Sequence, residues 1–489
     1  MVSPVVLLAV PLGLALCVPL VGMASRKAAG FVPVAASLFN LVVSVGLLPD
    51  ALEEPIVANL GGFAPPFAIT LFAGPVGVLL SALVALAGLA VSLYALSYIS
   101  EGPTIRYHTL YTLLLVGATG VVLTGDVFNL FVFFEILCIS SYALVAYVGD
   151  RAGTEASIKY LIQGALGSAL LLIGIGLLYG LFGTLNMADI AARMGSVDPG
   201  PVFVAMVLII TGLGVEAAIF PLNAWLPDAH SSAPSSISAM LSGIAIEVGL
   251  YAVVRMVFTV FGASSMLMFL VFMGLLTLLV GELCAFAQSN IKRMLAYSSI
   301  GQMGLIVFAL ALATVHSVTG GLFQLVSHTL SKALLFLAVG YMVYRSGSME
   351  ISSLEGMGRR MPLTSFAFTV GAFSLVGLPP FIGFPSKFLI VRSALAEQGV
   401  LLQVLVGLLL AATVVEGAYF LRVIQTVYFK KGRQQEARRE APAVALFSMF
   451  VFVVLIVVIG VYPNLISNAL ESGASELLER ADYVRSVLG

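Results

Sequence analysis

The residues of this chain that could do chemistry are single carboxylates, amines and one imidazole set inside long apolar runs. Glu135 stands in "NLFVFFEILCISSYALV", and Glu216 stands five residues before Pro221 in "GVEAAIFPLNAWLPDAH". The other members of this set are Glu247, Glu282, His328, Lys332, Lys387 and Glu416, with Lys159 near the start of its apolar run. Such groups can bind and release protons near neutral pH once burial shifts their pKa values. The pattern therefore indicates proton transfer between isolated titratable residues.

The apolar runs around these residues are typical of a membrane protein. Of the 489 residues, 60% are apolar and only 10% are charged, whereas a soluble domain carries about a quarter charged residues. An ionisable side chain at the middle of a span costs roughly 2.5–3.5 kcal/mol on insertion scales. Each of them is therefore a functional candidate, with a structural ion pair as the alternative, above all for Glu282 and Glu416.

The elements that must position these groups are membrane-spanning helices. A span needs about 20 mainly apolar residues, which predicts an all-α polytopic protein with fourteen spans, centred near residues 14, 38, 84, 115, 138, 171, 211, 247, 276, 304, 332, 377, 415 and 454. Fifteen loop Lys and Arg fall on one side, and only Arg193, Arg392, Arg480 and Arg485 on the other. Basic loops stay in the cytoplasm, so both termini should lie outside a cell membrane.

The seventh and twelfth spans contain helix-breaking prolines. They read "GVEAAIFPLNAWLPDAH" and, at residues 374–390, "SLVGLPPFIGFPSKFLI". Proline removes a backbone donor, and irregular backbone survives at membrane depth only inside protein or beside a watery cavity. Each break lies beside a charge, Glu216 or Lys387, which is the usual pointer to an ion pathway. A simple proline kink is the alternative.

Several function classes are excluded by the sequence. A net charge of −1 leaves no basic face for nucleic acid. Cys17, Cys138 and Cys284 match no metal-binding or redox spacing, and only His328 of the four histidines lies deep in a predicted span, which argues against haem or quinone chemistry. We therefore expect no cofactor and no metal site, and any electron transfer should occur in partner subunits.

Five motifs, in order over most of the chain, carry a specific resemblance. They are "GDVFNLFVFFEIL", "FPLNAWLPDAHSSAPSSISAMLSG", "IKRMLAYSSIGQMG", "HTLSKALLF" and "GLPPFIGFPSKFLI". The chain resembles the antiporter-like subunits of the complex I superfamily, most of all the D subunit of Mrp-type Na+/H+ antiporters and its counterpart in membrane-bound hydrogenases. The resemblance implies a subunit of a multi-subunit membrane complex that moves H+, or exchanges Na+ for H+, through two half-channels joined by a polar axis.

The resemblance also implies an internal organisation. Residues 1–100 would form helices 1–3, and residues 431–489 would form helix 14 and a polar tail. Two inverted five-helix repeats, helices 4–8 and 9–13, would occupy residues 101–260 and 261–430. Glu135, His328, Lys332 and Lys387 match the family's titratable residues, so the resemblance assigns them to the proton path.

The chain departs from the family at three further positions. Glu216 and Glu247 stand where the family has lysines, and Gln302 stands where some members have a histidine. Two buried carboxylates such as Glu135 and Glu216 do not both stay ionised. They would share a proton or hold a cation between them, or this subunit has lost pumping and acts as a spacer. A self-contained secondary transporter is a further alternative, and both a stand-alone antiporter and a redox-driven pump fit the pattern.

Overall fold

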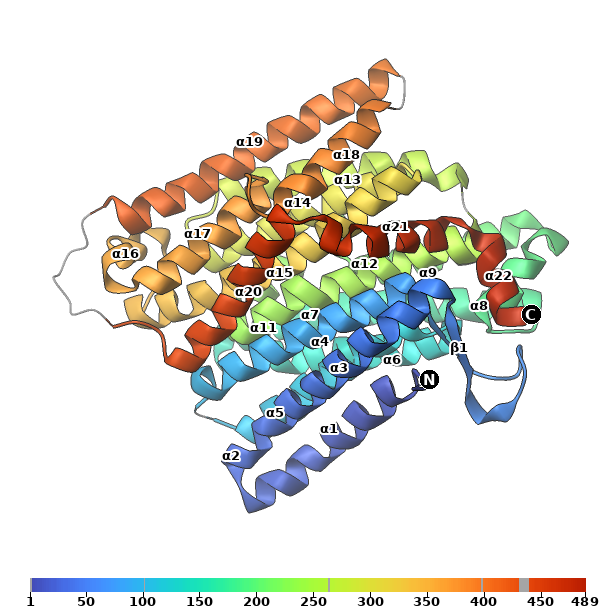
Figure 1. Ribbon diagram of the computed structural model, residues 1–489, viewed down its shortest axis with the longest axis horizontal. Coiled ribbons are helices and arrows are strands. Elements are labelled where there is room, and N and C mark those ends of the chain that lie inside the picture. Colours follow the sequence, from blue (N-terminus) through green and yellow to red (C-terminus); the bar gives the residue numbers. More distant parts are fainter. Residues whose placement is uncertain (1, 101, 263, 397–398, 431–438) are drawn as a thin grey trace.

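A computed structural model of the chain describes residues 2–100, 102–262, 264–396, 399–430 and 439–489. Its long helices run alongside one another as a bundle, and a small antiparallel hairpin lies at one end of it (Figure 1). The elements up to the first broken helix are α1 (Val6–Ala24), α2 (Arg26–Ala29), α3 (Phe31–Glu53), β1 (Ile56–Asn59), β2 (Thr70–Ala73), α4 (Pro75–Tyr98), α5 (Thr104–Leu123), α6 (Val127–Val145), α7 (Arg151–Phe182), α8 (Met187–Arg193), α9 (Pro199–Glu216) and α10 (Leu226–Ser232). The remaining helices are α11 (Ser235–Met240), α12 (Ile246–Arg255), α13 (Leu267–Phe286), α14 (Ile291–Ala311), α15 (Val315–Ser346), α16 (Met357–Arg360), α17 (Pro362–Val376), α18 (Gly383–Ala396), α19 (Val400–Tyr428), α20 (Ala443–Val461), α21 (Asn464–Leu478) and α22 (Arg480–Leu488).

The spans predicted from hydropathy correspond to these helices. Among the described residues, twelve helices are long and apolar enough to cross a membrane. The other two of the fourteen predicted spans fall on α5, which contains Arg106 and His108, and on α17 with α18, each shortened by the break between them. The predicted all-α polytopic architecture is confirmed.

Both predicted helix breaks are present. In the first, α9 ends at Glu216, Ala218 adopts a left-handed backbone with φ of 53°, and α10 begins only at Leu226. In the second, α17 ends immediately before Gly377, whose φ is 87°, and α18 begins at Gly383. A left-handed residue stops a helix because the next amide can no longer reach the carbonyl four residues back, and glycine tolerates that conformation best.

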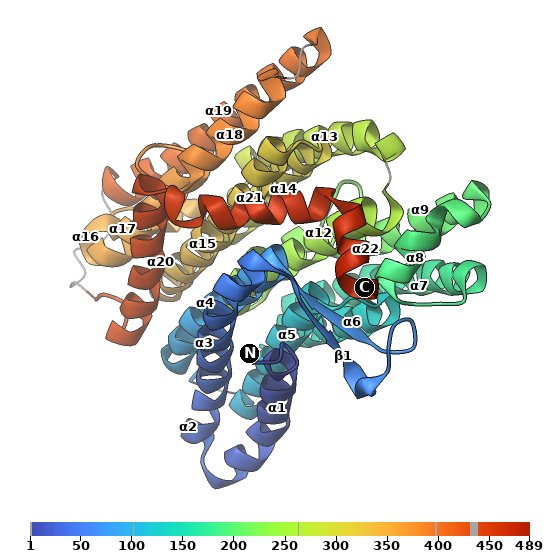
Figure 2. The ribbon, with the colours of Figure 1, turned by 45° about the vertical axis from the view of Figure 1, so that its right-hand side comes forward.

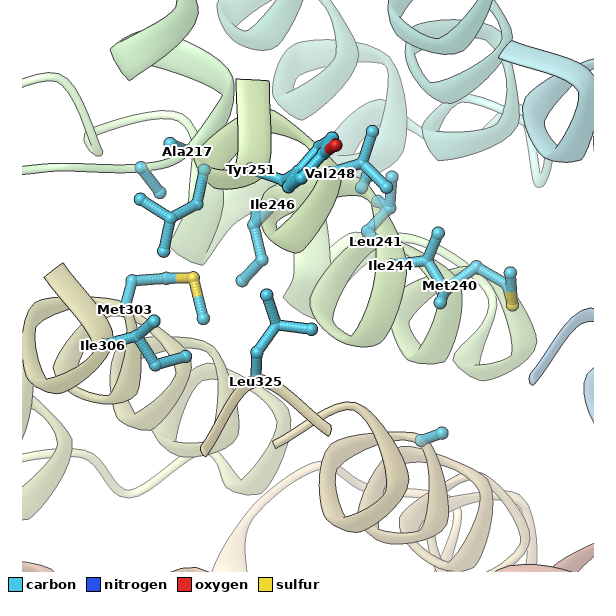
Figure 3. Packing of buried hydrophobic residues seen from close by; sticks show 14 of the residues in the cluster. Ala217, Met240, Leu241, Ile244, Ile246, Val248, Tyr251, Met303, Ile306 and Leu325 are labelled. Carbon is cyan, nitrogen blue, oxygen red and sulfur yellow. The ribbon is translucent and has the colours of Figure 1, made fainter. Parts of the chain in front are cut away.

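The centre of the bundle is α15, which is buried along its spanning length. A capping box at Thr314 and Ser317 starts this helix, each side chain accepting a hydrogen bond from the other residue's backbone. Next to α15 lies the span that contains α11 and α12, interrupted by π-helical turns at Leu241–Ala245 and Met256–Phe261. Figure 3 shows the apolar packing here, where Ile246 of that span points toward Met303 of α14 and Leu325 of α15.

The two ends of the bundle differ in what they carry. Both α2 and α16, which hold basic residues, lie at one end, whereas α8, α22 and the hairpin lie at the other, together with both chain termini (Figure 1). After α20 the chain turns, and α21 lies across α4 and α15 before α22 packs against α8 (Figure 2). The predicted polar tail is thus a pair of helices. Lys431, Arg433 and Arg438 of the predicted basic loop lie outside the described residues.

Candidate functional site

The first broken helix presents Glu216 at its end. Both oxygens of this buried carboxylate accept hydrogen bonds, Oε1 from the Tyr160 hydroxyl at 2.7 Å and Oε2 from the Cys138 thiol at 3.5 Å. Glu135 lies three residues before Cys138 on α6, and its Oε1 accepts a hydrogen bond from Ser168 of α7. Glu135 and Glu216 interact electrostatically, but each carboxylate is bound to neutral donors rather than to the other.

Packing around Glu216 fixes Tyr160 in place. The Tyr160 ring stacks on the indole of Trp225 with 3.7 Å between ring centroids and an interplanar angle of 3°. Trp225 in turn donates from Nε1 to the Val215 carbonyl at 2.8 Å, so the unwound segment folds back over the end of α9. On the other side Gly249 of α12 lies against the Glu216 backbone, where a Cβ would come within 3.2 Å. Because Gly249 has no side chain, α12, which carries Glu247, can pack directly against the first break.

Glu247 meets His328 at the junction of the two halves of the chain. Glu247 Oε1 lies 2.5 Å from His328 Nδ1, and both side chains are buried. No described residue forms a hydrogen bond with the other oxygen of Glu247 or with His328 Nε2. A buried polar atom without a protein partner generally takes a water molecule. This pair therefore joins α12 to α15, and each of its two side chains keeps one polar atom that can bind a water molecule.

Lys332 lies one turn after His328 on the same helix. It is fully buried and donates to the Leu295 carbonyl of α14 at 3.0 Å. It interacts electrostatically with Glu416, Glu282 and Lys387, which places it between the junction and the second break.

The second break holds a complete ion pair. Lys387 of α18 lies 2.6 Å from Glu416 Oε2 of α19, and the Glu416 side chain is 1% exposed. The other oxygen of Glu416 accepts from Gln302 Nε2 at 2.6 Å. Gln302 Oε1 accepts from Gln324, whose own oxygen accepts from the Ser386 hydroxyl at 2.5 Å. Glu416 and Gln302, weighed from sequence as secondary candidates, are thus the direct partners of Lys387 in this network.

The two remaining secondary candidates lie in different surroundings. Glu282 of α13 is buried and accepts from the Tyr419 hydroxyl at 2.8 Å, beside Gly301, where a Cβ would collide with the carboxylate. Lys159 is exposed and forms salt bridges with Glu155 at 2.8 Å and Asp228 at 2.9 Å. Lys159 therefore lies on the surface of the protein, apart from the buried titratable residues.

Two further buried titratable residues, Lys292 and His230, are not among the candidates taken from the sequence. Lys292, counted there as a loop charge, is buried and donates to the Ala233 carbonyl at 2.5 Å. His230, placed there near a span end, is fully buried between Trp225 and Phe336 and interacts electrostatically with Lys292. The signal that could have found them is the quoted motifs themselves, since "LPDAH" and "IKRMLAYSS" contain both residues. Among the described residues, no group of three or more His, Cys, Asp and Glu side chains is arranged to hold a metal ion.

Comparison with known proteins identifies the family of this chain. The transmembrane family described as NADH:quinone oxidoreductase/Mrp antiporter matches residues 124–415, a segment that contains Glu135, Lys387 and both helix breaks and ends one residue before Glu416. The chain belongs to this family. Among its relatives, the N subunit of the NADH-quinone oxidoreductase of Desulforudis audaxviator is 38% identical over 451 residues, covering 90% of this chain and 89% of that protein. The D subunit of the Na(+)/H(+) antiporter of Bacillus subtilis is 31% identical over 459 residues, covering 93% of each.

Solved structures of similar sequence have the same fold over the whole length of the chain. A chain of the membrane-bound sulfane sulfur reductase, an archaeal respiratory membrane complex, superposes with a TM-score of 0.93 at 39% identity over 99% of both chains. A chain of the Mrp complex from Dietzia sp. DQ12-45-1b gives a TM-score of 0.91 at 26% identity over 99% of both chains. The chain therefore has the family fold from end to end, and the resemblance drawn from its motifs is confirmed.

Proposed function

We propose that this chain translocates protons as an antiporter-like subunit of a multi-subunit membrane complex. The observation that carries the proposal is the Glu247–His328 contact of 2.5 Å, because it joins the titratable residues of the first broken helix to those of the second. The row runs from Glu135 through Glu216 and Glu247 to His328, Lys332 and Lys387. Its relatives are named as subunits of a Na(+)/H(+) antiporter and of an NADH-quinone oxidoreductase, which supports the same role here.

Each half of the row has a distinct part in the proposal. Residues 101–260 and 261–430 form the two repeats, each with one broken helix and one half-channel. In the first, Glu135 accepts the proton and Glu216 passes it on while Tyr160 and Cys138 stabilise its charged form. In the second, Lys387 exchanges its proton when its contact with Glu416 opens and closes. Glu282 interacts electrostatically with Lys332, and Gln302 donates a hydrogen bond to Glu416.

The donors around Glu216 favour protons over sodium in the first half. A cation between Glu135 and Glu216 would need their oxygens to face it, whereas a hydroxyl and a thiol already lie against both oxygens of Glu216. The contacts that the structure gives Glu216 come from hydrogen-bond donors, which suit a carboxylate that gains and loses protons. The proton-sharing form of the carboxylate pair is therefore the one we propose, with Na+ left to act elsewhere in a complex that exchanges it.

The role of Glu135 is testable in inside-out vesicles that contain the assembled complex. Glu135→Gln keeps the shape and the hydrogen bond of the side chain but cannot carry a proton as an acid. We expect proton uptake, followed by quenching of a pH-sensitive dye, to fall at least tenfold. The matched control is Glu155→Gln, which removes a carboxylate from the exposed salt bridge with Lys159. Undiminished uptake in Glu135→Gln, with normal assembly on a native gel, would support the spacer alternative instead.

The membrane orientation follows from the proposal and has its own test. With the basic loops in the cytoplasm of the cell, both termini face outside. In a background with the three cysteines replaced by serine, a membrane-impermeant maleimide should label Ser486→Cys in whole cells and should label Gly432→Cys only after the membrane is opened. Labelling of both positions from the same side would contradict the fourteen-span topology.

Membership of a complex separates this proposal from a lone secondary transporter. A subunit should co-purify with other membrane subunits, as the named assemblies of its relatives do, and should transport only within that assembly. Proton transport by the purified chain alone in liposomes would favour the self-contained transporter.

A further inference from the structure

A line of buried polar side chains leads from the Glu247–His328 contact toward the end of the bundle that carries both chain termini. Glu247, Tyr251 and Arg255 follow one another at intervals of four residues, so they share one face of α12, and all three are buried. Tyr483 of α22 is buried beside Arg255, whose guanidinium carbon lies 5.7 Å from the centroid of the tyrosine ring. We name these four side chains, Glu247, Tyr251, Arg255 and Tyr483, the α12 track.

Each side chain of the α12 track has a polar atom without a partner. No described residue forms a hydrogen bond with Glu247 Oε2, the Tyr251 hydroxyl, Arg255 Nη2 or the Tyr483 hydroxyl. Buried polar atoms of this kind generally bind water. Because they recur at successive turns of one helix, their water sites would form a row from the junction of the two halves to Glu476 of α21. Glu476 interacts electrostatically with Tyr251, Arg255 and Tyr483 and is partly exposed, so the row ends at the protein surface.

Arg255 holds a positive charge across this row. Its Nη1 donates to the Val122 carbonyl at 3.3 Å and also to the Thr124 carbonyl, and its guanidinium carbon lies 5.5 Å from the centroid of the Phe72 ring. It forms no salt bridge with any described residue, Glu476 included. A guanidinium does not lose its proton in proteins. A fixed arginine beside a water-filled passage excludes protons by its charge.

We propose that Arg255 seals the α12 track, so that water reaches the junction from the surface at Glu476 but protons do not flow back along it. In an unsealed track, a proton would move from Glu476 through water and the Tyr251 hydroxyl to Glu247 Oε2, while Arg255 neither gains nor loses a proton. The inference rests on the proposed function, because such a leak crosses the membrane only where Glu247 also connects to the other side through Glu216 and Glu135. The alternative is that Arg255 only anchors α22 through its contact with Tyr483.

The test measures passive proton leak through the assembled complex in proteoliposomes. A pH gradient is imposed in sodium-free buffer without any redox substrate, the membrane potential is clamped, and the decay of the gradient is followed with a pH-sensitive dye. We expect Arg255→Gln to leak at least tenfold faster than the parent, whereas Arg255→Lys, which keeps the charge, should leak at the parental rate. The matched control is Arg480→Gln, which removes another positive charge of α22, one that donates to the Ala191 carbonyl, and should stay within twofold of the parent.

A double variant separates an opened track from a damaged fold. Adding Glu247→Gln to Arg255→Gln removes the acid at the inner end of the track and should return the leak to the parental rate. An equal leak with and without Glu247→Gln would overturn the proposal, because the protons would then cross elsewhere. A parental leak in Arg255→Gln, in a complex whose driven uptake is still abolished by Glu135→Gln, would overturn the seal and leave the proposed function standing.

Hydration of the α12 track can be tested in the unmodified complex. Hydroxyl radicals generated from bound water by an X-ray pulse oxidise the side chains next to that water, and mass spectrometry locates the oxidised residues. We expect Tyr251 and Tyr483 to be oxidised at least fivefold faster than Tyr111, which is equally buried but donates its hydroxyl to the Gly88 carbonyl at 2.8 Å. Equal oxidation of Tyr251 and Tyr111 would mean that the track is dry and would overturn the proposal.

Discussion

The contact between Lys387 and Glu416 allows a sharp test of the second half of the path. Glu416→Gln removes the charge that faces the amine at 2.6 Å while keeping an oxygen and an N–H group in place. We expect the complex to assemble and its proton transport to fall at least tenfold, because Lys387 would lose its only salt-bridge partner among the described residues.

The size of this effect follows from the geometry. Two unit charges separated by 2.6 Å attract each other by about 6 kcal/mol at an effective dielectric constant of 20. The cost of removing both charges from water offsets part of this attraction, and deleting one partner of a buried pair typically costs about 3–5 kcal/mol. The variant leaves the charge of Lys387 without the carboxylate that lies 2.6 Å away in the parent, so the proton exchange that we propose at this contact should slow. A factor of ten in rate corresponds to about 1.4 kcal/mol, well within this range.

A second variant separates proton transfer from a purely structural ion pair. Lys387→Arg keeps a positive charge beside Glu416, but a guanidinium does not deprotonate in proteins. We expect its thermal stability in detergent to stay within a few degrees of the parent while transport is lost. The assay is dye quenching in inside-out vesicles with matched amounts of assembled complex, and Glu155→Gln is again the control. If Glu416→Gln and Lys387→Arg both transport at the parental rate, the ion pair is structural and the reasoning fails.

Three further predictions address other parts of the chain. Glu247→Gln and His328→Gln should be strongly non-additive in transport, with a coupling of about 1.5–3 kcal/mol for a hydrogen bond to a charged group; additive losses in the double variant would mean that the contact does not carry the proton. Tyr160→Phe removes one donor from Glu216 and should slow transport about three- to tenfold, whereas Tyr179→Phe, an exposed tyrosine of the same helix, should not. Burial raises the pKa of Glu476 on α21 from 4.5 to about 7. Because the folded-state pKa lies above the unfolded one, α21 should dock most strongly below about pH 4.5. Its docking should weaken as the pH rises through 7. Glu476→Gln should remove this dependence of amide-exchange protection, corrected for intrinsic exchange, and an unchanged pH dependence would refute the assignment.

The helix breaks could be predicted from sequence because their cause is local. Proline fixes its own backbone angle and removes a donor wherever the chain passes, so Pro221 and the run at Pro379 and Pro380 mark the two unwound segments without any knowledge of packing. Hydropathy likewise depends on composition within one window. α5 was found in the same way, although its polar residues, Arg106 among them, lower its hydropathy.

The partners of the titratable residues could not be predicted, because each contact joins distant segments. Tyr160 and Glu216 are separated by 56 residues, and Gln302 and Glu416 by 114. Nothing in either local sequence indicates which faces of α7 and α9, or of α14 and α19, turn toward each other. The error at Lys292 has the same origin. Its neighbour Arg293 forms a surface salt bridge with Asp228 at 2.8 Å, while Lys292, one residue earlier, turns inward.

The two halves of the path solve the problem of buried charge in different ways. The second half balances an amine with a carboxylate, because Lys387 lies 2.6 Å from Glu416. The first half has carboxylates at all three of Glu135, Glu216 and Glu247, and Glu135 and Glu216 interact electrostatically, so two negative charges there would repel each other. Hydroxyl and thiol donors such as Tyr160 and Cys138 can stabilise one negative charge but cannot neutralise several. We therefore propose that the carboxylates of the first half share protons, whereas the second half exchanges protons at the contact between Lys387 and Glu416. The Glu247–His328 contact is where a stored proton would pass from one kind of site to the other.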